Sequence, residues 1–210
     1  MAMEESHRRV QWVYGSTTNQ ELEERYDQWA AEYDRDLAED FAWNAPDNGA
    51  RVLAGLVPAD ANVLDAGAGT GLAGVCLAAA GFTNMAAMDI SQGMLDVAEE
   101  KNVYSSFHQM VMGETLGFNT GEFDAVISIG VFTLGHAPIS SFDELVRVTR
   151  PGGYIVFSLR TDMVEDGYQD YFNKMEAAGQ WKLTQVTEPF QPMPKGEPEV
   201  FHQIWAFQVN

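Results

Sequence analysis

The 210-residue sequence contains one cysteine and few basic residues. Cys76 alone cannot form an internal disulfide, which favours a reducing compartment. Twelve Lys and Arg stand against 31 Asp and Glu, and the formal net charge is −19. A surface of this sign repels phosphate backbones and anionic lipid. We therefore expect neither a nucleic acid nor a membrane as partner.

Long apolar runs are also missing. No uninterrupted apolar stretch approaches the roughly 20 residues that a membrane-spanning helix needs. The first ten residues, MAMEESHRRV, lack the apolar core of a signal peptide. The sequence contains no CxxC or HExxH motif, so no metal is expected. A soluble, cytoplasmic protein follows from these patterns.

The patterns that are present predict alternating strands and helices. Two helices are expected first, over residues 17–40 and 47–57. Strands are predicted over 62–65, 84–89, 107–112, 123–129 and 154–159, and helices over 72–80, 91–100, 142–149 and 168–178. Two last strands, 182–187 and 200–209, fit an antiparallel hairpin, and Pro151-Gly152-Gly153 fits a turn. This alternation predicts a doubly wound, mostly parallel α/β sheet, with its ligand beyond the carboxyl ends of the strands.

Residues 64–74, LDAGAGTGLAG, form a glycine-rich loop that can be read in two frames. Residues 69–74 fit the dinucleotide fingerprint G-x-G-x-x-G. Residues 65–71, DAGAGTG, fit a different glycine loop, one whose first residue is an acid. A carboxylate repels a pyrophosphate but attracts the ammonium of S-adenosylmethionine, so Asp65 favours the latter. Alternatively, Asp65 caps backbone amides in the turn.

The end of the second predicted strand carries a further acid, Asp89. An acid about 20 residues past such glycines accepts hydrogen bonds from ribose hydroxyls, which both cofactors carry. Its alternative role is to cap the helix that begins near Ser91. Ile90 and Met94 fit an apolar wall for the adenine, although Met94 fits a core position equally well. Met112-Gly113-Glu114, past the third strand, is expected at the adenine edge.

Four motifs in this order resemble class I S-adenosylmethionine-dependent methyltransferases: DAGAGTG, the acid Asp89, FDAVIS and RPGGYIVF. The segments YDQWAAEYDRDL, ISQGML and SLRT resemble in particular the methyltransferase-like protein 27 group. The resemblance implies a Rossmann-like fold with helices on both faces of a seven-stranded sheet, in the order 3-2-1-4-5-7-6 with strand 7 antiparallel. It implies one domain over 1–210, with an N-terminal helical lid in 1–57 and the core in 58–210. The cofactor residues that it implies in the loop and at the fourth strand are Gly67, Gly69, Thr70, Gly71 and Ser128.

The resemblance also implies that Tyr26, Trp29 and Tyr33 cover the cofactor and acceptor as part of the lid. Their spacing of three and four residues is equally typical of a helix that packs on the sheet. Tyr26 and Tyr33 are assigned to the cofactor and Trp29 to the acceptor.

Methyl transfer from a sulfonium requires alignment of the acceptor and exclusion of water. The segment 128–141 is expected to line the acceptor pocket, with Val131 and His136 in contact with the acceptor. His136 has the pKa range of a general base, but a loop histidine bonded to backbone is an equally open reading. Arg160 could hold an acceptor carboxylate, or form an ion pair with Asp162 or Glu165.

Two absences favour a small-molecule acceptor. No NPPY-like tetrapeptide for a flipped base follows the fourth strand, and no carboxylates for Mg²⁺ lie there. The predicted function is methyl transfer from S-adenosylmethionine to a small molecule, by a monomer or a dimer. Two alternatives remain: an NAD-dependent oxidoreductase, for which no Tyr-x-x-x-Lys pair is found, and a non-catalytic S-adenosylmethionine-binding protein.

Overall fold

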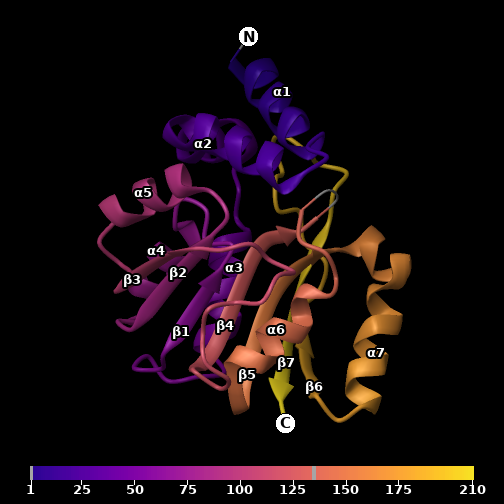
Figure 1. Cartoon of the computed structure of the whole chain (residues 1–210). Coiled ribbons are helices and arrows are strands. Elements are labelled where there is room, and N and C mark those ends of the chain that lie inside the picture. Colours follow the sequence, from indigo (N-terminus) through magenta and orange to yellow (C-terminus); the bar gives the residue numbers. More distant parts are fainter. Residues whose placement is uncertain (1, 134–135) are drawn as a thin grey trace.

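A computed structural model describes residues 2–133 and 136–210 and contains one mixed sheet (Figure 1). The strands are β1 (Val63–Ala66), β2 (Met85–Asp89), β3 (Ser106–Gln109), β4 (Phe123–Phe132), β5 (Thr149–Arg160), β6 (Trp181–Val186) and β7 (His202–Val209). Their order is β3-β2-β1-β4-β5-β7-β6. The first five strands run parallel, and β7 pairs antiparallel with both β5 and β6. The predicted strand order and the final antiparallel hairpin are confirmed.

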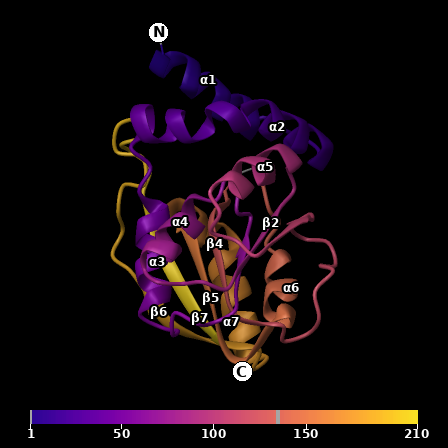
Figure 2. The same ribbon diagram turned by 90° about the vertical axis from the view of Figure 1, so that its left-hand side faces the viewer.

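Helices cover both faces of the sheet (Figure 2). One face packs against α3 (Ala45–Ala54), α4 (Leu72–Ala79) and α5 (Gln92–Glu100), and the other against α6 (Ser141–Val148) and α7 (Gln169–Ala177). Alternate residues of each parallel strand point to opposite faces, so a strand covered on both sides reads as a continuous apolar run. In β4, Val126 packs toward α6 while Ile127 packs toward α3.

The N-terminal segment stands over the carboxyl ends of the parallel strands (Figure 1). It consists of α1 (Ala2–Tyr14), α2 (Asn19–Asp36) and the π-helical turn η1 (Leu37–Phe41). The Thr18 side chain accepts from the Glu21 amide and begins α2. No helix was predicted over α1; over its described side chains, residues 5–14, only Val10 and Val13 are buried apolar residues, too few for a clear helical pattern. The next helix, α3, packs on the sheet instead of above it.

The largest differences from the predicted strand boundaries lie in β3, β4 and β5, and β4 continues to Phe132, three residues beyond its predicted end. Strand β3 ends at Gln109, so residues 110–112 leave the sheet. Strand β5 begins at Thr149, and the predicted turn at 151–153 is an irregularity inside it, between the pairs Phe123–Thr149 and Ala125–Tyr154. Gly152 has φ +77°, and such a residue lets a strand bulge and continue. After β5 come the short turns η2 (Thr161–Met163) and η3 (Val164–Tyr168). In the described part of the chain, no helix is long and apolar enough to cross a membrane.

Candidate functional site

The loop after β1 exposes its backbone to a ligand. Gly67 and Gly69 have φ of +80° and +54°, values that side chains other than glycine rarely adopt. The amides of Gly67 and Ala68 donate to the Met88 carbonyl at 2.7 and 2.9 Å and hold the loop against β2. A Cβ on Gly67 would lie 2.2 Å from Val131 Cγ2, whereas one on Gly69 would have no atom within 4 Å. The loop is therefore tight at Gly67 and open at Gly69.

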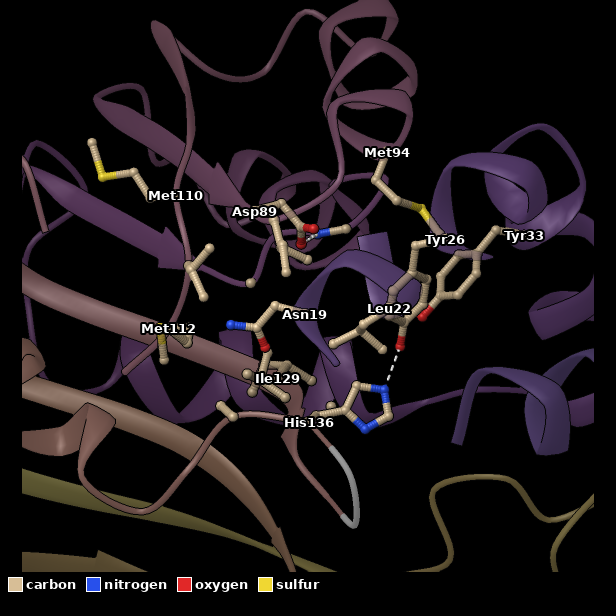
Figure 3. Close-up of a pocket in the computed structure, with 17 residues that line it drawn as sticks. Asn19, Leu22, Tyr26, Tyr33, Asp89, Met94, Met110, Met112, Ile129 and His136 are labelled. Atoms are coloured by element: carbon tan, nitrogen blue, oxygen red, sulfur yellow. Dashed lines mark hydrogen bonds between the residues drawn. The ribbon is translucent and has the colours of Figure 1, made fainter. Parts of the chain in front are cut away.

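A cavity lies between this loop, α2 and the ends of β2 and β4; we call it the first cavity (Figure 3). It contains about 680 Å³ of atom-free space, part of it open to solvent. Its lining residues come from the lid, the strand ends and the segments after β3 and β4. They are Asn19, Leu22, Tyr26, Tyr33, Gly67, Gly69, Asp89, Ile90, Met94, Met110, Val111, Met112, Ile129, Gly130, Val131, His136 and Ala137. None of these lining residues is a Lys or an Arg.

Asp89 closes β2 and faces the first cavity. One carboxylate oxygen accepts from the Gly69 amide at 2.8 Å, and the other accepts from the Ser91 amide at 2.9 Å. Burial raises the pKa of this carboxyl, and these backbone amides oppose that shift. A carboxylate offers about four lone-pair positions, so both oxygens can accept further hydrogen bonds from a ligand. Ser91 itself caps α5 and accepts from the Met94 amide at 3.0 Å.

Asp65 lies under the glycine loop in a smaller space that shares Tyr33, Gly67 and Gly69 with the first cavity. Its Oδ2 accepts from the Tyr104 hydroxyl at 2.6 Å, while its buried Oδ1 has no partner in the described structure. Burial raises the pKa of Asp65 to about 7, and the Tyr104 hydrogen bond opposes the shift. A buried carboxylate oxygen without a partner is costly, and a ligand cation would satisfy it. The Gly74 backbone amide also opposes the rise in the pKa of Asp65, so the alternative role of Asp65 as a cap of loop amides stays open.

Four predicted cofactor residues lie outside both spaces. Gly71 begins α4, and a Cβ there would lie 2.9 Å from the Tyr104 ring. Ser128 is buried in β4 and donates to the Ala66 carbonyl at 2.7 Å. Gly113 packs on Pro138, and Glu114 is exposed. The place predicted for Gly113-Glu114 is taken by residues 110–112, since β3 ends three residues before the predicted boundary.

Acidic side chains of α2 hold the lid to the core. Asp34 accepts from the Thr70 hydroxyl at 2.5 Å and pairs with Lys101 at 2.6 Å. Asp27 accepts from the Ser91 hydroxyl at 2.6 Å and from the Gly93 amide at 2.9 Å. Thr70 thus bonds to the lid, and its hydroxyl is not directed at the first cavity. The lid is fastened directly beside the loop that a cofactor would contact.

We expect Asp34→Asn to loosen α2. Partly exposed ion pairs contribute about 0–1 kcal/mol, so global stability should barely change. Local opening should rise, and amide hydrogen exchange of residues 19–36 should be about three- to tenfold faster, equivalent to ~0.7–1.4 kcal/mol. The control is Asp47→Asn, which breaks the exposed pair Asp47–Arg51 on α3. Equal exchange in the two variants would refute the fastening role of Asp34.

His136 joins the lid to the segment after β4. Its Nε2 lies 2.8 Å from the Tyr26 hydroxyl (Figure 3), and its Nδ1 lies 2.8 Å from the Thr133 hydroxyl. Both of these partners are side chains. Residues 134 and 135 of the predicted acceptor segment lie outside the described residues. A role of His136 as general base stays a prediction.

The other two predicted acceptor residues, Trp29 and Arg160, line a second cavity that adjoins the first. The second cavity lies between α1, α2 and the segment before β7. Its lining residues are Val10, Tyr14, Tyr26, Trp29, Tyr33, Leu37, Trp43, Gly130, Thr133, Arg160, Pro192, Met193, Glu197, Val200 and His202. Trp29 is also part of the lid core, where its Nε1 donates to Asp36 at 3.0 Å. Arg160 forms the ion pair with Asp162 that the sequence left open; the side chain of Glu165 lies outside the described part.

The structure thus gathers nine predicted residues around the first cavity: Tyr26, Tyr33, Gly67, Gly69, Asp89, Ile90, Met94, Val131 and His136. Sequence reasoning anticipated Met112 near the site but missed Met110 and Val111, which it placed in a strand. It also missed Tyr14, Trp43, Glu197 and His202 of the second cavity, for which no local pattern gives a signal. Across residues 2–133 and 136–210, no group of three or more His, Cys, Asp or Glu side chains could hold a metal ion.

Sequence comparisons point to one kind of protein. Residues 64–157 match the family model described as a methyltransferase domain. Methyltransferase-like protein 27 of Homo sapiens is 33% identical over 165 residues, which are 75% of this chain and 66% of that protein. Demethylmenaquinone methyltransferase of Clavibacter sepedonicus is 39% identical over 97 residues, 45% of this chain and 39% of that protein. The chain therefore spans less than two thirds of either relative's length.

Solved structures share the fold at low sequence identity. A TehB-like S-adenosylmethionine-dependent methyltransferase of Corynebacterium glutamicum superimposes with a TM-score of 0.63 and 20% identity, covering 88% of this chain and 98% of its own. The [4+2]-cyclase SpnF superimposes with a TM-score of 0.69 and 16% identity, covering 92% of this chain and 97% of its own. At these identities the likeness concerns the fold alone.

Proposed function

This chain belongs to the class I S-adenosylmethionine-dependent methyltransferases, and from that premise we propose that it transfers a methyl group from this cofactor to a small-molecule acceptor. The observation that supports the proposal most is the pair of buried carboxylates, Asp65 and Asp89, on neighbouring strands beside the glycine loop. The two acids and the absence of Lys and Arg from the lining of the first cavity make a poor site for a pyrophosphate.

The residues fit S-adenosylmethionine in three ways. The unpartnered Oδ1 of Asp65 suits the ammonium of the amino acid end. Asp89, fixed by two backbone amides, has capacity left for the ribose hydroxyls. Ile90, Met94 and residues 110–112 give an apolar surface for the adenine. The open backbone at Gly69 lets the ligand approach between these groups.

Asp65 and Asp89 would hold the cofactor, which would supply a methyl group activated by the sulfonium charge, with the thioether of S-adenosylhomocysteine as the leaving group. The protein's part is alignment and exclusion of water. Tyr26 and Tyr33 of α2 lie over the first cavity, and His136 fixes the Tyr26 hydroxyl. Both ring nitrogens of His136 have partners, so a role as base requires acceptor binding to release one of them.

Calorimetric titration with S-adenosylmethionine, S-adenosylhomocysteine and NADH tests the proposal. We expect micromolar binding of the first two and no binding of NADH. Binding of NADH alone would overturn the assignment of the glycine loop and restore the oxidoreductase alternative. Binding without turnover is the second alternative, since transfer needs no dedicated catalytic residue. Mass-spectrometric detection of S-adenosylhomocysteine, formed from S-adenosylmethionine in a mixture of small amines, phenols, thiols and acids, separates transfer from binding.

A further inference from the structure

The second cavity shares Tyr26, Tyr33 and Gly130 with the first cavity. The two cavities therefore adjoin at these residues, and a molecule in the second cavity would lie directly beside the ligand of the first cavity. The walls of the second cavity are rich in aromatic residues, with Tyr14, Trp29 and Trp43 beside the two shared tyrosines. Aromatic walls bind flat apolar groups, and their faces attract cations.

Of the two charged side chains that line the second cavity, Arg160 is in an ion pair and Glu197, among the described residues, is not. Arg160 is the one Lys or Arg in its lining, and Asp162 binds it at two points, with Nε to Oδ1 at 3.0 Å and Nη2 to Oδ2 at 2.6 Å. This pair neutralises the guanidinium. Glu197 is half-buried, and its carboxylate has no hydrogen-bond or ion-pair partner in the described structure. The unpaired charge of the second cavity is thus negative.

The pKa values of two neighbouring groups reflect both charges of the second cavity, the Glu197 carboxylate at Tyr14 and the Arg160 guanidinium at His202. Burial, and after it the Glu197 carboxylate, raises the pKa of Tyr14 to about 12, while Arg160 opposes this with a smaller effect. Burial, and then Arg160, lowers the pKa of His202 to about 4, so this imidazole is neutral at pH 7. His202 is 3% exposed, and its Nδ1 has no partner in the described structure. A neutral ring without a partner can hydrogen-bond an uncharged polar group of a bound molecule.

We infer that the second cavity is the acceptor subsite and takes a small arylalkylamine, whose ammonium pairs with Glu197 and whose ring packs between Tyr14, Trp29 and Trp43. The ammonium passes its proton to the Glu197 carboxylate before the nitrogen lone pair bonds to the methyl group. The inference rests on the proposed function and specifies its substrate class. A chain with a formal charge of −19 attracts cations over long range and repels carboxylates. A carboxylate in the cavity would meet the unpaired Glu197 and a guanidinium that is already paired. The sign of the acceptor charge is thus opposite to that expected from Arg160 in the sequence alone.

Three ligands that share a phenylethyl group and differ in the charge of their polar end test this inference: 2-phenylethylamine, 3-phenylpropionate and 2-phenylethanol. Each is titrated into the 210-residue protein saturated with S-adenosylhomocysteine. We expect the amine to bind at least tenfold more tightly than the acid and the alcohol. Glu197→Gln should abolish this preference and leave the affinity for S-adenosylhomocysteine unchanged. The matched control is Glu199→Gln, an exposed acid of the same segment that does not line the second cavity, and it should keep the preference.

Tighter binding of the acid, no binding of the amine, or an amine preference that survives Glu197→Gln would each overturn the inference. In all three cases, intact binding of S-adenosylhomocysteine leaves the proposed function standing. Failure to bind S-adenosylhomocysteine is the separate outcome that removes the proposed function and the inference with it.

Discussion

Asp65→Asn should stabilise the ligand-free protein at pH 8 while weakening its binding of S-adenosylmethionine. The pKa of Asp65 is about 7 in the fold, against about 3.9 in an unfolded chain. Between these values the folded state binds more protons than the unfolded state, so the stability of the wild type falls as pH rises from about 4 to 7. The three-unit difference corresponds to about 4 kcal/mol above pH 7. A buried amide without a partner costs about 1–3 kcal/mol, and the net gain at pH 8 should be about 1–3 kcal/mol.

The same substitution should weaken cofactor binding while it raises stability, and this combination identifies the role of Asp65. Without the carboxylate the cofactor's ammonium loses its partner, and the affinity should fall at least tenfold, about 1.4 kcal/mol. Urea unfolding at pH 4 and pH 8 and calorimetric titration measure the two effects. Asp60→Asn, an exposed acid just before β1, is the control and should change neither. A variant that is less stable at pH 8 and binds with wild-type affinity would show that Asp65 is purely structural.

The features that could be predicted from the residues themselves depend on local backbone chemistry. The glycine loop and the acids Asp65 and Asp89 come from short motifs in which a strand ends at a turn. The helix predicted over 91–100 begins where the Ser91 hydroxyl accepts from the Met94 amide. In these cases the residues that determine the structure lie within a few positions of one another, whereas the strand order was predicted from the family resemblance.

The site residues that sequence missed depend on strand length or on distant partners. An apolar run such as residues 107–112 does not show where pairing with the neighbouring strand stops, and β3 stops at Gln109. Tyr14, Glu197 and His202 come from three separate segments that meet only after the lid has packed on the core. For Arg160 the sequence named Asp162 as one of two candidate partners, and the turn at η2 brings Asp162 to the guanidinium.

Gly67→Ala should destabilise the protein by about 3 kcal/mol, the second large effect that we expect. A left-handed conformation costs a side-chain-bearing residue about 1–2 kcal/mol, and overpacking costs about 1–3 kcal/mol. At Gly67 both apply, because φ is +80° and the new methyl group would lie 2.2 Å from Val131 Cγ2. Gly69→Ala is the matched control, since its φ is +54° but its Cβ would meet nothing within 4 Å. Gly69→Ala should lower the free energy of unfolding only by the cost of the left-handed conformation, about 1 kcal/mol.

Val131→Ala separates the two contributions, because it removes the methyl groups that the new Cβ would strike. In a double-mutant cycle followed by urea unfolding, the pair Gly67→Ala with Val131→Ala should recover about 1–2 kcal/mol relative to the sum of the single changes. Such coupling would mean that Val131 of β4 packs tightly against the loop at Gly67 and limits the first cavity at that point. Strict additivity would mean that the loop needs glycine for its conformation alone, and that Val131 can move aside when a ligand enters.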